Sequence, residues 1–179
     1  MATGPLVVST SITRDRRPPM ADERTTALSF LRWHRATLLL KCSGLDVQQL
    51  TCRPVSTSAL SLIGLVRHAT ESERFWFRVV MAGDEAPPLY SASGGDDQTF
   101  DVAGSDEGAI VRAFDAWRGE VQFSDRLVEA APTLDITGNE PGEGPVSLRW
   151  VLAHLLEEYA RHNGHADLIR EQIDGAVGI

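Results

Sequence analysis

The sequence predicts an all-α protein built as a bundle of four long helices. Apolar residues recur at steps of three and four in four separate segments, each about 20 to 28 residues long, and no segment shows convincing strand alternation. Helices of this length can share one core, which favours a bundle. The segments run from Asp22 to about Cys42, from Ser58 to about Ala82, from Ser105 to about Ala131 and from Ser147 to Gly175.

Residues with known capping and breaking preferences bound these segments. Asp22 and Ser147 are suited to the N-cap of the first and last helices, because their side-chain oxygens can accept hydrogen bonds from free backbone N–H groups. Gly175 stands where a glycine commonly follows a helix, and Pro132 ends the third helix. Each predicted helix is therefore consistent with its local sequence.

A short lead-in and three connections complete the predicted organisation. Residues 1–20 are expected to be an extended or mobile lead-in, since RDRRPP is charged and interrupted by proline, and residues 21–179 form one domain. We expect connecting loops at 45–57, 83–104 and 133–145. A loop as long as the second is typically a lid, a binding loop or a mobile segment.

Composition excludes several classes of function. A net charge of −8 argues against a nucleic-acid partner, because binding phosphates needs a basic surface. No apolar run approaches the roughly 20 residues of a membrane span, and the start is unlike a secretory signal, so a cytoplasmic protein is expected. Cys42 and Cys52 form no disulfide framework and no CxxC pair.

One face of the last predicted helix has an unusual composition. Its apolar ends enclose a carboxylate and two imidazoles, in the series Val151, Leu155, Glu158, His162, His165 and Ile169. Buried polar groups of this kind are costly without partners, and a divalent metal ion would satisfy all three. Imidazole and carboxylate suit zinc best, with nickel next. The acid–base glutamate of an HExxH protease helix is missing.

The second predicted helix offers a further ligand. His68 lies on an apolar stripe, where a histidine usually belongs to the core, but the last helix already offers two or three ligands that need a partner. We therefore predict that His68 joins the metal site, since three protein ligands and an open position are typical of a catalytic site. Glu71 and Glu73 either pair with arginine or solvent, or hydrogen-bond an imidazole.

These residues support a resemblance over nearly the whole chain. From about Asp22 to Gly178, the chain resembles the DinB-like (DinB/YfiT) superfamily, specifically its DUF664 branch, through LSLIGLVRHATESERFWFRVVMAG, FDVAGSDEGA and LRWVLAHLLEEYARHNGHADLIREQIDGAVG. The resemblance implies an up-down four-helix bundle with a divalent metal on one histidine of the second helix and two side chains of the last. These positions match His68, Glu158 and His162.

The chain departs from many members of that superfamily at one ligand. Both ligands of the last helix are histidines in many members, whereas the first falls on Glu158 here. The mycothiol-dependent maleylpyruvate isomerases are similar in using a His/Glu/His set. His165 stands where many members have glutamine, and the resemblance leaves it as a ligand, a partner of metal-bound water or a substrate contact.

The resemblance also implies an activity. Characterised relatives use mycothiol, bacillithiol or glutathione for S-transfer or isomerisation, and the arginine-rich composition suggests an actinobacterial host with mycothiol as cosubstrate. A metal-bound thiolate would be the nucleophile, because a metal lowers the pKa of a coordinated thiol. We expect His165 or Glu71 to move a proton, and Arg67, Arg149 and Arg161 to bind the cosubstrate.

Two other functional classes stay open from the sequence. One is a stress-associated bundle that binds a metal or small ligand without turnover. The other is a metal-dependent hydrolase, since the same ion could activate water. A small-molecule substrate and a homodimer are expected in the enzyme interpretation. A groove beside the metal lined by arginines would favour the thiol enzyme, and a sealed site with four protein ligands would favour the binding protein.

Overall fold

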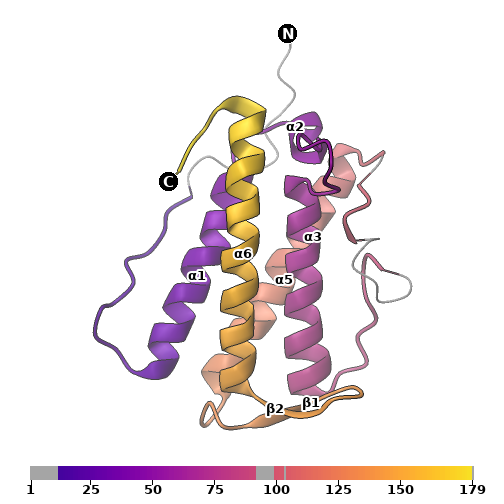
Figure 1. Cartoon of the computed structure of the whole chain (residues 1–179). Helices are drawn as coiled ribbons and strands as arrows, with labels where there is room; N and C mark the ends of the chain where they lie inside the picture. The colour runs from indigo at the N-terminus through magenta and orange to yellow at the C-terminus, as the bar shows by residue number, and fades with distance from the viewer. Residues whose placement is uncertain (1–11, 92–98, 103, 179) are drawn as a thin grey trace.

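The computed structural model describes residues 12–91, 99–102 and 104–178, and within them the chain is mostly helical (Figure 1). Helix α1 packs beside α6, and α3 packs beside both α5 and α6. The long helices are α1 (Glu23–Cys42), α3 (Leu62–Glu73) continued by the π-helix η1 (Arg74–Ala82), α5 (Glu107–Ala130) and α6 (Leu148–Asp174). The predicted all-α class is therefore supported.

Two predicted loops contain regular structure. The first includes the short helix α2 (Val47–Thr51), whose start is stabilised by reciprocal hydrogen bonds between the side chains and backbone N–H groups of Asp46 and Gln49. The third contains the antiparallel hairpin β1 (Thr137–Glu140) and β2 (Gly144–Ser147). The hairpin strands have no apolar alternation, so the sequence pattern did not indicate them.

The second long segment ends at Ala82 as predicted, but it begins later than predicted and changes helix type along its length. It begins at Leu62 instead of Ser58, because Ser61 is the N-cap and its Oγ accepts a hydrogen bond from the N–H of Gly64 at 3.1 Å. From Arg74 it continues as the π-helix η1, whose backbone bonds span one residue more than those of an α-helix. This π-helical segment lies next to the candidate functional site.

The lead-in is described only in part, since residues 1–11 lie outside the described residues. Residues 12–20 contain no helix or strand, and the guanidinium groups of Arg14 and Arg17 lie 4.2 and 4.1 Å from the ring centre of Trp33 on α1.

In the described part of the chain, no helix has the length and apolar character needed to cross a membrane.

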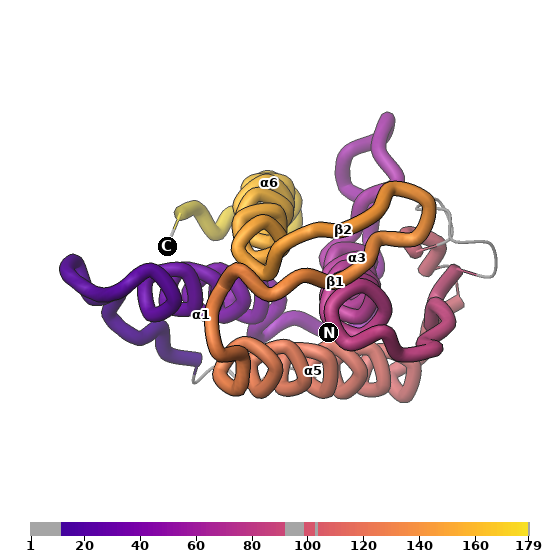
Figure 2. The backbone as a smooth tube through the Cα atoms, turned by 90° about the horizontal axis from the view of Figure 1, so that it is seen from below, coloured from indigo at the N-terminus to yellow at the C-terminus, as the bar shows by residue number. Residues whose placement is uncertain are grey.

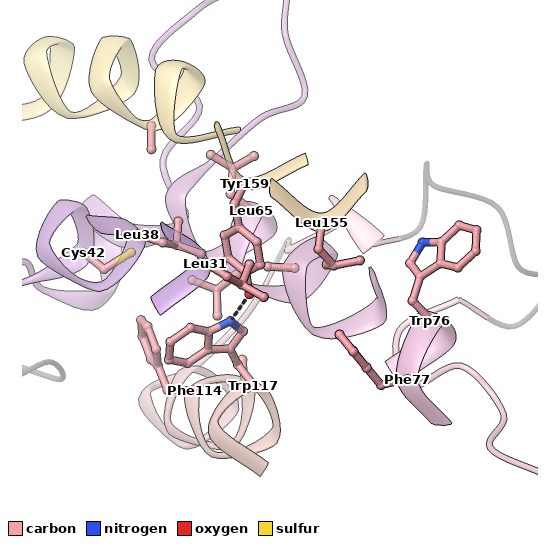
Figure 3. Packing of buried hydrophobic residues seen from close by; sticks show 14 of the residues in the cluster. Leu31, Leu38, Cys42, Leu65, Trp76, Phe77, Phe114, Trp117, Leu155 and Tyr159 are labelled. Carbon is pink, nitrogen blue, oxygen red and sulfur yellow. Dashed lines mark hydrogen bonds between the residues drawn. The ribbon is translucent and has the colours of Figure 1, made fainter. Parts of the chain in front are cut away.

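All four long segments contribute to one hydrophobic core (Figure 3). Leu31 of α1, Phe77 of η1, Phe114 of α5 and Leu155 of α6 are fully buried. Seen from below in Figure 2, the hairpin passes across the ends of η1 and α6. The core thus holds the helices in a fixed arrangement.

A buried polar network joins side chains from all four long helical segments. Arg35 donates through Nε and Nη2 to the two carboxylate oxygens of Glu73, each at 2.7 Å, and through Nη1 to Asp125 at 2.7 Å. The hydroxyl of Tyr159 donates to Glu73 at 2.9 Å, and Nε1 of Trp117 donates to that hydroxyl at 2.9 Å. Burial, reinforced by the Glu73 carboxylate, raises the pKa of Tyr159, so the phenol stays a donor.

We predict that Glu73→Ala lowers the free energy of unfolding by about 3–5 kcal/mol, because it leaves the buried Arg35 guanidinium without its main partner. The measurement is urea unfolding followed by circular dichroism. Glu129→Ala is the matched control, since it breaks an exposed ion pair with Arg32 worth about 0–1 kcal/mol. Equal losses in the two variants would contradict the structural role of Glu73.

A second prediction concerns the contact between the hairpin and η1. A Cβ at Gly138 would lie 2.2 Å from the carbonyl oxygen of Val80, so Gly138→Ala should destabilise the fold by about 1–3 kcal/mol. At Gly119, an exposed position of α5, a Cβ meets nothing within 4 Å, and Gly119→Ala should stabilise by about 0.5–1 kcal/mol. Thermal unfolding of both variants tests this opposite sign.

Candidate metal centre

Three side chains from two helices meet at one point of the structure. Nε2 of His68 on α3 lies 3.0 Å from Oε2 of Glu158 on α6, and Nε2 of His162 lies 3.4 Å from the same oxygen. Each residue offers one ligand atom, and these atoms all lie within 4.8 Å of one another. Glu158 and His162 share a face because they are four residues apart, and the packing of α3 on α6 adds His68. One ion could contact all three.

These three side chains lie between the core and solvent. Their exposed fractions are 14% for His68, 21% for Glu158 and 18% for His162. The ring of Phe100 stacks on His68 with a centroid distance of 5.4 Å, and a cavity of about 10 Å³ separates the cluster from Leu38 and the core behind it. The cluster is therefore partly desolvated but open on its outer side.

The protonation states suit metal binding. Burial, together with the nearby His68, lowers the pKa of His162 to about 4, so its imidazole is neutral near pH 7. Burial alone would raise the pKa of Glu158, but the hydrogen bond to His68 and the electrostatic interaction with the neighbouring histidines lower it overall. A carboxylate oxygen and a neutral imidazole nitrogen are ordinary zinc ligands, so these residues fit a divalent metal.

His165 lies beside this cluster. Its Nδ1 is 3.3 Å from Nδ1 of His162, on the side of that ring away from Glu158. His165 is not among the three residues whose ligand atoms converge. The structure thus places it in contact with a candidate ligand, and its role in moving a proton stays a prediction.

A pocket of about 590 Å³ opens beside the cluster. His68 and Glu158 are part of its lining, which comes from α3, η1, α6 and the connection after η1. The other lining residues are Glu71, Ser72, Arg74, Phe75, Trp76, Val79, Ala86, Pro88, Ser91, Thr99 and His154. Such a concave, largely apolar space next to polar groups is typical of a small-molecule site.

Most of the lining residues were not predicted from the sequence, and His154 and Trp76 illustrate why. His154 stands one helical turn before Glu158, at the same spacing that separates Glu158 from His162, and this spacing could have identified it. Trp76 lies in the π-helix, and nothing in the apolar pattern distinguishes that segment from an α-helix. The structure adds both residues to the candidate site.

Glu71 and Arg67 both hold the connection after η1. Oε1 of Glu71 accepts hydrogen bonds from the backbone N–H groups of Leu89 and Tyr90, at 2.7 and 2.6 Å. Nη1 of Arg67 donates to the carbonyl of Asp101 at 2.6 Å, and its guanidinium lies 4.4 Å from the ring centre of Tyr90. Glu71 also lines the pocket, whereas Arg67 is not among the lining residues.

The other two predicted cosubstrate-binding arginines lie elsewhere. Arg149 forms ion pairs with Glu23 and Asp135 at the start of α6, about 14 Å along the helix axis from the cluster. Arg161 pairs with Glu157 on an exposed face of α6. Among the described residues, neither arginine lines the pocket. Both arginines instead form surface ion pairs with acidic residues of the same protein.

One comparison with known proteins gives a match. A family model described as mycothiol-S-transferase matches residues 26–175, which include nearly all of the four long helices. The matched region contains His68, Glu158 and His162. A search of curated proteins found no match.

We predict that zinc stabilises the chelator-treated protein by about 2.7 kcal/mol at a free zinc concentration one hundred times its dissociation constant. The stabilisation should disappear in His162→Ala, because a converging ligand is removed. His34→Ala, which changes a histidine outside the cluster, should keep it. Thermal melts with and without zinc provide the measurement, and equal zinc effects in both variants would refute the site.

Proposed function

Because the chain belongs to the mycothiol-S-transferase family, we propose that it is a divalent-metal-dependent S-transferase that uses mycothiol or a related small thiol. The family is part of the DinB-like superfamily, so the resemblance to that superfamily is confirmed. The observation that carries the proposal is the convergence of His68, Glu158 and His162 beside an open pocket that His68 and Glu158 help to line.

His68, Glu158 and His162 would hold the ion, with zinc preferred over nickel for this mixture of nitrogen and oxygen ligands. When bound, such an ion lowers the pKa of a thiol at its open position and makes the thiolate available near neutral pH. The half-buried Glu158 carboxylate keeps both imidazoles oriented toward one point. The protein therefore preorganises the three ligand atoms for an ion.

The protein's own thiols are poor nucleophiles. Burial raises the pKa of Cys42 to about 12 and also raises the pKa of Cys52. A thiol with so high a pKa is almost fully protonated at neutral pH, whereas the thiolate is the reactive form. This supports a small thiol as the source of the nucleophile.

His165 is our candidate for the proton acceptor. Its Nδ1 faces His162, which leaves Nε2 for proton exchange with the thiol or with solvent. Glu71 contributes by holding the connection that forms one wall of the pocket, through its bonds to Leu89 and Tyr90. We propose that it positions the wall, and that any part it has in proton transfer is secondary.

The test measures consumption of mycothiol with an alkylating acceptor by the zinc-loaded protein. Glu158→Gln and His162→Ala should lower kcat/KM by about 10²-fold or more, since loss of the ion removes several kcal/mol of stabilisation. Cys52→Ser should retain activity, because the protein's own thiol takes no part.

Other outcomes would separate the alternatives. Metal-dependent ester hydrolysis without any need for thiol would favour the hydrolase. Bound metal with neither activity would favour a binding protein.

A further inference from the structure

Four aromatic rings form a continuous series beside the candidate metal centre. We call Phe75, Trp76, His154 and Trp150 the aromatic wall. Trp76 is at its centre, with ring centroids 5.1 Å from Phe75, 4.8 Å from His154 and 5.1 Å from Trp150. Trp150 and His154 stack nearly parallel, 5.1 Å apart at 10°. The wall joins η1 to α6.

The aromatic wall is both part of the pocket and open to solvent. Phe75, Trp76 and His154 line the pocket that His68 and Glu158 also line. Phe75 is 37% exposed and Trp150, at the outer edge of the wall, is 48% exposed. Isolated exposed aromatic residues are common, but rings in contact along one pocket wall offer a surface on which a flat ligand can stack.

The charged side chains of the same pocket already have protein partners. Arg74 donates to Glu120 at 2.8 Å and to the carbonyl of Pro87 at 2.9 Å. Oε1 of Glu71 accepts two backbone hydrogen bonds. Away from the proposed ion, an anionic ligand beside the aromatic wall would meet the Glu71 carboxylate, and the Arg74 guanidinium there is already paired with Glu120, so burying an anion against this wall would be unfavourable. The pocket chemistry therefore favours an uncharged occupant.

We propose that the aromatic wall binds the electrophilic acceptor of the thiol, and that this acceptor is an uncharged molecule with a flat aromatic ring. This inference rests on the proposed function. The ring stacks against Phe75 and His154, and its reactive carbon faces His68 and Glu158 in the same pocket. In the transfer, a bond forms between the thiol sulfur and that carbon, the leaving group departs with its electron pair, and the thiol proton passes to a base.

The first arm of the test measures binding without turnover. Calorimetry compares 1,3-dinitrobenzene, which is flat, uncharged and lacks a leaving group, with 3,5-dinitrobenzoate, its charged analogue. We expect the uncharged ring to bind more tightly. Phe75→Ala should weaken its binding about three- to tenfold, the range expected for losing one ring contact. Trp33→Leu, a change to a tryptophan outside the pocket, should leave it unchanged.

The second arm measures thiol transfer by the metal-loaded protein. Phe75→Ala should raise KM for 1-chloro-2,4-dinitrobenzene about three- to tenfold, with chloride leaving, and should not change KM for the aliphatic acceptor iodoacetamide. Trp76→Leu should have the same selective effect. Since Trp76 is buried, Phe75→Ala decides the test if Trp76→Leu does not fold.

The two arms separate this inference from the function on which it rests. Transfer that persists with equal KM changes for both acceptors, or tighter binding of the anion, would overturn the role of the aromatic wall and leave the S-transferase intact. Ring binding by the metal-loaded protein with no thiol transfer to any acceptor would overturn the proposed function and, with it, the acceptor role.

Discussion

The ion pair between Arg35 and Glu73 is the constraint on which the rest of the structure depends. It is fully buried, and its cost in desolvation is offset only if every hydrogen bond is made. Tyr159 and Trp117 complete those bonds, so all four long segments must adopt one relative position. A purely apolar core would tolerate small sliding of the helices, whereas this network does not.

The candidate metal centre inherits its geometry from that network. Glu73 lies five residues after His68 on the same continuous helical segment, and Tyr159 directly follows Glu158 on α6. Fixing Glu73 against Tyr159 therefore sets the separation of His68 and Glu158. The ligand atoms converge because a rigid polar core lies one turn away, and this supports preorganisation of the site.

The pocket beside the metal centre combines rigid and anchored walls. Helices α3 and α6 provide one side, and the wider turn of η1 contributes Phe75 and Trp76. The opposite side is the connection after η1, which Glu71 ties to the helix through two backbone hydrogen bonds. Loops positioned by a rigid scaffold commonly form binding sites. The same arrangement explains why Glu71, whose carboxylate was predicted to move a proton, accepts backbone hydrogen bonds from this connection.

The sequence by itself determined the helical class, the helix ends at Asp22, Ser147 and Gly175, and the shared helix face of Glu158 and His162, because these depend on spacing and capping within one segment. The sequence also proposed His68 as their partner, but only the tertiary structure decided that the three side chains meet, that Arg149 pairs with Glu23, and that His154 meets the Trp76 ring of another helix. Such contacts join residues far apart in the chain, and periodicity holds no information on which helix faces meet.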